Sequence, residues 1–260
     1  EYFNAGMNSS MLKGAQLSGG SRAVELGLIT LKGTKSLANI MFMFGLLTAA
    51  GILYISYLNT GSTSNSYHSA IIALIGVLIG YFYTAKPIKL SSRYGLGEIA
   101  IFLSFGPLLT LGSGFAISME TIQLFSNEFY NLMILGVPIG LLTTNILFIN
   151  QFPDYTSDKK VGKNHLVVLF GKKASRWIYA INLALATGSL YYMAVENIVN
   201  ETQDSLFLYV LIPITIIYSF YLISGLFKYY NNRKLIKYNI HTIYFHMLFS
   251  FIYMIILANF

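Results

Sequence analysis

FYNLMILGVPIGLLTTNILFIN, residues 129–150, is a stretch of 22 residues without a charged side chain. A helix of about 20 mainly apolar residues is long enough to cross the hydrocarbon core of a bilayer. A membrane β-strand would instead alternate polar and apolar residues over about 10 positions, and this stretch does not alternate. The stretch therefore predicts a membrane-spanning helix.

Six further apolar stretches surround this one in the chain of 260 residues, of which 55% are hydrophobic and only 10% charged. Soluble proteins contain about 25% charged residues, so a water-soluble globule is excluded. We predict an all-α membrane protein, a single multispanning helical bundle over residues 1–260. The seven predicted spans are Leu37–Leu58, Tyr67–Ala85, Tyr94–Ile117, Phe129–Asn150, Trp177–Glu196, Leu206–Phe227 and Asn239–Asn259. Cysteine is absent, which excludes disulfides and thiolate chemistry.

The basic residues are distributed unevenly over the connections between spans. All 17 Lys and Arg residues fall before the first predicted span or after the second, fourth and sixth, which are connections on one side of the membrane. By the positive-inside rule this side is cytoplasmic, and the C-terminus lies on the opposite side. Because insertion accounts for the net charge of +7, no nucleic-acid partner is expected.

Glycines and prolines inside the spans predict local packing. Pro107 is expected to kink the third span, because proline interrupts helix hydrogen bonding. Six glycines are expected to permit close approach of neighbouring helices: Gly45, Gly51, Gly76, Gly80, Gly136 and Gly140.

Oxygen-bearing side chains recur every four residues where the fourth span ends, in Asn150-Gln-Phe-Pro-Asp154-Tyr-Thr-Ser-Asp158. On a helix, Asn150, Asp154 and Asp158 would share one face, one turn apart. Two carboxylates at this spacing repel each other unless a cation lies between them. Oxygen ligands suit a hard ion such as Mg2+, which often shares its shell with substrate phosphate.

A solvated helix end would show the same spacing, and Pro153 would then end the span. A second copy of the pattern favours a binding site instead. Glu1-Tyr-Phe-Asn4-Ala-Gly-Met-Asn8 aligns with residues 151–158, and both copies lie on the predicted cytoplasmic side. Two facing oxygen clusters of this kind predict a clamp in which two metal ions hold a diphosphate.

These motifs resemble those of the UbiA superfamily of intramembrane aromatic prenyltransferases. The most specific match is Asn150–Gly171, which is similar to the second motif of that family. Gly19–Arg22 and Tyr83–Glu98 are similar to the branch that contains 1,4-dihydroxy-2-naphthoate polyprenyltransferases. The resemblance implies nine helices in the complete protein, two of them preceding residue 1, with motif loops at residues 1–36 and 150–175.

The resemblance also implies a reaction and a set of site residues. A polyprenyl group would pass from an allylic diphosphate to an aromatic acceptor such as 1,4-dihydroxy-2-naphthoate, in quinone biosynthesis, within a cavity that the bilayer surrounds. Two Mg2+ ions would be held by Glu1, Asn4, Asn8, Asn150, Asp154 and Asp158. The diphosphate would contact Arg22, Lys86, Arg93, Lys159 and Lys163. The catalytic residues would be Asp154, Asp158, Lys86 and Tyr83.

Several alternatives stay open at this point. Asn4 and Asn8 stand where the family has aspartates, which fits a divergent or nonenzymatic member and equally an engineered replacement. A polytopic secondary transporter would place charges near the bilayer midplane, and the predicted spans have almost none there. A CDP-alcohol phosphotransferase would carry a DGxxAR-type signature, which this sequence lacks.

Overall fold

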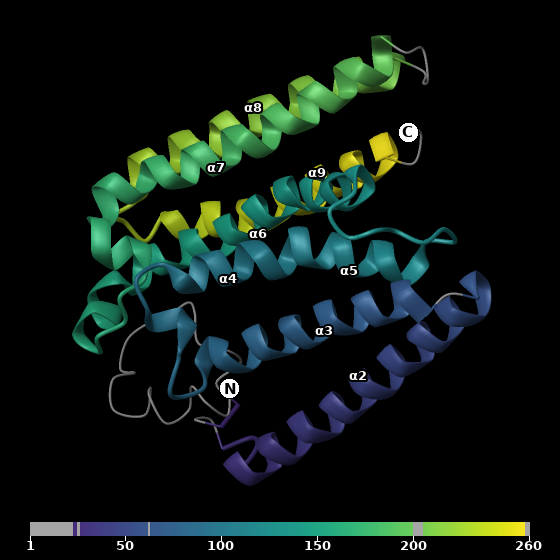
Figure 1. Cartoon of the computed structure of the whole chain (residues 1–260). Helices are drawn as coiled ribbons and strands as arrows, with labels where there is room; N and C mark the ends of the chain where they lie inside the picture. Colours follow the sequence, from purple (N-terminus) through teal and green to yellow (C-terminus); the bar gives the residue numbers. More distant parts are fainter. Residues whose placement is uncertain (1–22, 25–26, 62, 200–204, 258–260) are drawn as a thin grey trace.

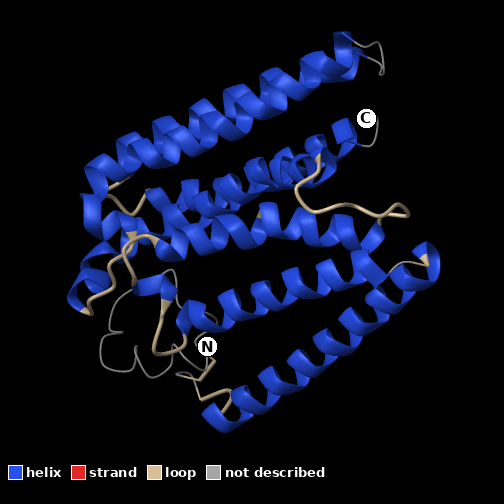
Figure 2. Ribbon diagram, viewed as in Figure 1, coloured by secondary structure: helices blue, strands red, loops and turns tan. Residues whose placement is uncertain are grey.

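The computed structural model describes residues 23–24, 27–61, 63–199 and 205–257, which are mostly helical with no strand among them (Figure 2). Its helices are α2 (Leu31–Thr60), α3 (Thr63–Thr84), α4 (Leu96–Phe105), α5 (Pro107–Ile117), α6 (Asn127–Lys160), α7 (Leu166–Val199), α8 (Ser205–Tyr229) and α9 (Leu235–Leu257). The predicted site residues Glu1, Asn4, Asn8 and Arg22 lie outside the described residues.

Six stretches of described helix are long and apolar enough to cross a membrane: Leu31–Leu58, Ser64–Thr84, Leu96–Ile117, Asn127–Lys160, Val210–Tyr229 and Leu235–Leu257. They confirm six of the seven predicted spans. The seventh, Trp177–Glu196, lies within α7, which is helical but is not among the six. The protein is an integral, multi-pass membrane protein, and the count of nine helices stays a prediction.

The basic connections described by the structure gather at one end of the bundle. The connections after α3, α6 and α8 all lie at the left end in Figure 1, and those after α2 and α5 at the right end. This grouping is the one that the charge pattern predicts. The acidic motif at the end of α6 therefore lies at this end, close to where a membrane surface would be.

The third predicted span is two helices rather than one kinked helix. α4 ends at Phe105 and α5 begins at Pro107, while Gly106 between them has the non-helical angles φ −119° and ψ −109°. Proline has no N–H to donate and suits the first turn of a helix, where that donor is not needed. The break also brings the backbone of Gly106 against α6.

The glycine prediction is right for α6 and wrong for α2 and α3. A Cβ on Gly136 would overlap the backbone of Gly106, and one on Gly140 would lie 2.6 Å from the carbonyl oxygen of Phe102. Added Cβ atoms on the α2 and α3 glycines would meet nothing within 4 Å: Gly45, Gly51, Gly76 and Gly80. The difference follows from packing, because α2 leaves its side chains largely exposed, whereas α6 lies at the centre of the bundle.

The main core forms where α6, α7, α8 and α9 meet. Phe148, Phe152, Phe245 and Phe249 are fully buried there, and Tyr179 completes the contact from α7. Burial of an aromatic side chain contributes about 150–250 Å² of contact area, so these rings hold the C-terminal half of α6 in place.

The segment 150–175, predicted as a motif loop, is mostly helix. α6 continues through Pro138 and Pro153 to Lys160, and α7 begins at Leu166, so only the residues between them form a loop. Prolines are tolerated inside a membrane helix when neighbouring helices pack against it. Gln151 and Phe152, which precede Pro153, are buried in this way. The first predicted loop, 1–36, is likewise shortened by α2, which begins at Leu31.

Candidate active site

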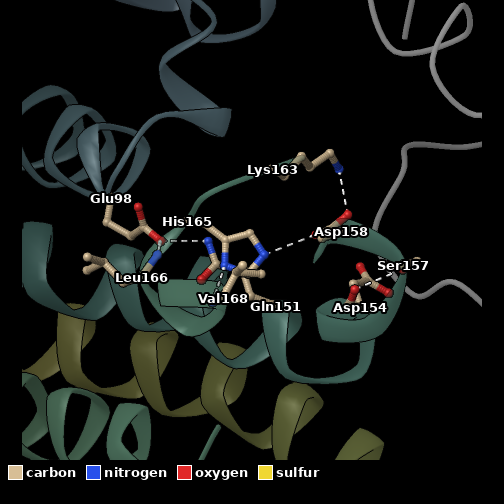
Figure 3. A network of polar contacts seen from close by, with 9 residues as sticks. All are labelled: Glu98, Gln151, Asp154, Ser157, Asp158, Lys163, His165, Leu166 and Val168. Carbon is tan, nitrogen blue, oxygen red and sulfur yellow. Dashed lines mark hydrogen bonds and ion pairs between the residues drawn. The ribbon is translucent and has the colours of Figure 1, made fainter. Parts of the chain in front are cut away.

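Asp154 and Asp158 lie in the last two turns of α6, on one helix face (Figure 3). Both are buried, with 3% and 5% of their surface exposed. Buried carboxylates are uncommon and require charged or hydrogen-bonding partners. The third member of the pattern, Asn150, is held from α9, because its Oδ1 accepts a hydrogen bond of 2.8 Å from Asn239 Nδ2.

Two side chains from the short loop after α6 contact the carboxylate of Asp158. Lys163 Nζ lies 2.9 Å from Oδ1, and His165 Nε2 lies 3.2 Å from Oδ2. Gly162 has φ +75°, a conformation that glycine adopts without strain, and it lets the chain turn back toward the end of α6. The turn places Lys163 beside the carboxylate, and its role as a phosphate-binding residue stays a prediction.

From the sequence alone, His165 could be a base, but its place in a loop favours a solvated histidine. It is instead 3% exposed and stands directly before α7. Its Nδ1 accepts the backbone N–H of Val168 at 3.3 Å, so the proton of the neutral ring is on Nε2 and is donated to Asp158. One histidine thus caps α7 and orients the carboxylate of α6.

Glu98, at the start of α4, joins three helices behind the acidic pair (Figure 3). Its Oε1 accepts hydrogen bonds from Gln151 Nε2 at 2.9 Å and from the backbone N–H of Leu166 at 3.0 Å. The carboxylate is 3% exposed and lies at the N-terminus of α7, where a negative charge is favourable. It therefore fixes where α7 begins relative to α6.

Replacing Glu98 with Ala is expected to destabilise the fold by about 2–3 kcal/mol. The change leaves the Gln151 amide and the Leu166 N–H buried without an acceptor, and an unsatisfied buried donor costs about 1–3 kcal/mol. Glu98→Gln keeps one acceptor oxygen and should lose less. Thermal unfolding of the purified variants measures the difference. Equal stability of Glu98→Ala and the unmodified protein would contradict this role.

The remaining predicted residues lie around the same end of the bundle. Tyr83 is half-buried near the end of α3, and Lys86 is exposed just beyond it. Arg93 is exposed and donates a 2.9 Å hydrogen bond from Nη2 to the carbonyl oxygen of Pro87. Lys159 is exposed, with Nζ 5.8 Å from the centre of the Tyr155 ring. Within the described part of the chain, Lys163 is the predicted basic residue that contacts Asp158.

The oxygen atoms among the described site residues are of the type that binds Mg2+. Asp154 and Asp158 supply carboxylate oxygens, the ligands that a hard divalent ion prefers. No group of three or more His, Cys, Asp or Glu side chains that could hold a metal occurs within the described ranges. Both oxygens of Asp158 contact Lys163 or His165, so an ion at this carboxylate would share it with those partners or replace one of them.

An apolar cavity of about 280 Å³ lies between α2, α3, α4 and α5. Its lining includes Leu53, Ile72 and Leu108, and none of the predicted site residues. Ile72 is in the first half of α3, and Leu108 is in α5, a helix that runs to the end of the bundle opposite the one where α3 and α6 end (Figure 1). The structure thus separates a polar, charged end from an apolar cavity deeper in the bundle.

Known proteins resemble this chain over much of its length. It is 26% identical over 182 residues to a 1,4-dihydroxy-2-naphthoate octaprenyltransferase from Haemophilus influenzae, an alignment that covers 70% of this chain and 56% of the relative. It is 31% identical over 123 residues to the enzyme of the same name from Bacillus subtilis, covering 47% and 37%. A 2-carboxy-1,4-naphthoquinone phytyltransferase from Synechocystis is 32% identical over 169 residues, covering 63% and 48%.

The chain thus spans between about a third and somewhat more than half of the length of these relatives. No solved structure matches it. The match to a family decides against the transporter and the CDP-alcohol phosphotransferase. Residues 22–252 match the model of the UbiA prenyltransferase family, and the chain belongs to that family.

Proposed function

We propose that the protein transfers a polyprenyl group from an allylic diphosphate to an aromatic acceptor of the naphthoate class. The observation that carries the proposal is the buried pair Asp154 and Asp158, with Lys163 against it, at the end of a membrane-spanning helix. The names of the relatives from H. influenzae, B. subtilis and Synechocystis support the acceptor class, since each specifies a naphthalene ring compound.

The charges at this end of the bundle suit a diphosphate. Bound Mg2+, held by Asp154 and Asp158 and, in the proposed two-ion site, by Asn150, Glu1, Asn4 and Asn8, would neutralise negative charge on the leaving diphosphate. Lys163 is placed to contact a phosphate oxygen from beside Asp158. The other predicted contacts are the basic residues Arg22, Lys86, Arg93 and Lys159.

The apolar bundle suits the other half of the substrate. A prenyl chain is a hydrocarbon, so its transfer from the bilayer into a cavity lined by Ile72 and Leu108 costs little. The allylic cation must be kept from water until the aromatic acceptor attacks it. The half-buried ring of Tyr83 lies at the boundary between the charged end and the helices, where its face can stabilise that cation.

The proposed orientation follows from the basic connections. The end of the bundle that carries Lys86, Lys163 and Arg233 faces the cytoplasm, and the C-terminus lies on the other side. The water-soluble diphosphate would then be released into the cytoplasm.

The test is product formation by the full-length protein in membranes. The membranes receive Mg2+, a radiolabelled allylic diphosphate and either 1,4-dihydroxy-2-naphthoate or 4-hydroxybenzoate. We expect diphosphate release and a labelled naphthoate product, both abolished by EDTA. A variant with Asn4→Asp and Asn8→Asp should need less Mg2+ for half-maximal rate, because two negative charges are added to the proposed site. If neither protein forms product, the chain is a nonenzymatic member of the family.

A further inference from the structure

A second basic site lies at the turn between α8 and α9, and it is not part of the acidic site. A pocket of about 380 Å³ is lined there by two tyrosines and three cations, Tyr229, Arg233, Lys234, Lys237 and Tyr238. We call it the turn pocket. It shares no residue with the acidic site on α4, α6 and α7, although both lie at the same end of the bundle (Figure 1).

The cations of the turn pocket have no acidic counterpart. Residues 205–257 contain no Asp or Glu at all. Among the described residues Arg233, Lys234 and Lys237 make no ion pair. Their nearest counterparts are aromatic: Lys234 Nζ lies 5.9 Å from the centre of the Tyr229 ring, and Lys237 Nζ lies 5.8 Å from that of Tyr221. The pocket therefore carries a net positive charge that a bound anion would neutralise.

The turn that carries the pocket is held in place by its neighbours. The rings of Tyr229 and Tyr238 stack with centroids 5.6 Å apart. Arg176 of α7 donates from Nη1 to the carbonyl oxygen of Phe227 at 3.1 Å, and its guanidinium lies 4.4 Å from the centre of the Tyr230 ring. Because the turn is braced from α7, its backbone does not need to be ordered by the ligand, which lowers the entropic cost of binding.

An apolar stripe continues from the turn pocket along α9. At intervals of three or four residues from Lys237, one exposed helix face carries Ile240, Tyr244, Met247, Phe251 and Met254, which are between 47% and 63% exposed. Residues at this spacing lie one above another. A cationic pocket at the end of a bilayer-facing apolar stripe matches a molecule with a charged head and a hydrocarbon tail, whereas free phosphate would use only the pocket.

We propose that the turn pocket binds the phosphate of an anionic phospholipid headgroup, with an acyl chain along the α9 stripe. Basic pockets beside membrane helices hold such headgroups through charge, and each basic side chain near the lipid surface contributes about fivefold in affinity. The tyrosines suit the interface, where an aromatic ring meets both headgroup and hydrocarbon. This site would hold a structural lipid of the bilayer, independent of whether the proposed transferase activity is present.

Native mass spectrometry of the full-length protein in neutral detergent tests the proposal. With added phosphatidylglycerol, we expect retained lipid on the unmodified protein and about 30-fold weaker retention for the variant Lys234→Gln/Lys237→Gln. The control Lys32→Gln/Lys173→Gln removes two exposed cations elsewhere on the same side and should retain the lipid. Both pairs are exposed, so each variant should keep its thermal unfolding temperature.

Three results would overturn the lipid site. The first is equal retention of phosphatidylglycerol by the two double variants. The second is equal retention of phosphatidylcholine and phosphatidylglycerol, which would show that net negative charge is not recognised. The third is displacement of phosphatidylglycerol by an equal concentration of inorganic phosphate, which would show that the pocket binds the free anion and the stripe adds nothing.

Discussion

Turnover is expected to fall by about 100- to 1,000-fold when Asp158 is replaced with Asn, the range seen when one preorganised electrostatic group is removed from an active site. The amide keeps the shape of the side chain and removes its charge. Lys163, now 2.9 Å from the carboxylate, would lose its ionic partner, and the proposed metal site would lose one of its two described carboxylates. Initial rates of prenylated product at saturating substrates measure the loss.

A matched control exists on the same helix. Glu128 lies in the first turn of α6, at the opposite end, and is exposed. Glu128→Gln makes the same change from acid to amide far from the site, so turnover should stay within about twofold of that of the unmodified protein. Exposed substitutions of this kind also usually change stability by less than about 0.5 kcal/mol. If Asp158→Asn unfolds at the normal temperature and still turns over within tenfold of the unmodified protein, Asp158 has no central role in the reaction.

The largest expected effect on stability comes from Gly136→Ala, which should destabilise the bundle by about 3 kcal/mol. The added Cβ would overlap the backbone of Gly106 and the hydroxyl of Thr110. Backbone cannot rotate away as a flexible side chain does, so α5 and α6 would have to separate. That movement would also strain the 2.6 Å hydrogen bond from Thr110 Oγ1 to the carbonyl oxygen of Leu132. Unfolding of the purified protein in mixed micelles measures the change.

Gly188→Ala is the control for this prediction. Gly188 lies within α7, and a Cβ there would meet nothing within 4 Å. Since alanine favours a helix over glycine by about 1 kcal/mol, this variant should be as stable as the unmodified protein or slightly more stable. Equal stability of Gly136→Ala and Gly188→Ala would mean that α5 and α6 do not pack as closely as described.

The spans were predictable from hydropathy because each one is a local property of the chain. In a bilayer every backbone N–H and C=O must be paired internally, so an apolar stretch such as residues 129–150 has few choices besides a helix. The same holds for the spacing of Asp154 and Asp158, which share a face once α6 continues to Lys160. The glycines of α2 and α3 were misjudged, because the residue type shows that close approach is possible and does not show which helix approaches.

Helical class and the gathering of basic connections could be deduced from the order of residues, since they depend on apolar stretches of about 20 residues and on the charges between them. The spacing of the acidic pair is likewise local, and the family was indicated by the resemblance of the motifs. Tertiary structure alone decided what anchors the end of α6 that carries Asp154 and Asp158. Gln151 and Leu166 meet Glu98 across 53 and 68 positions of the chain, and Asn239 reaches Asn150 across 89. Such partners depend on how α4, α6, α7 and α9 pack, and no local pattern encodes that arrangement.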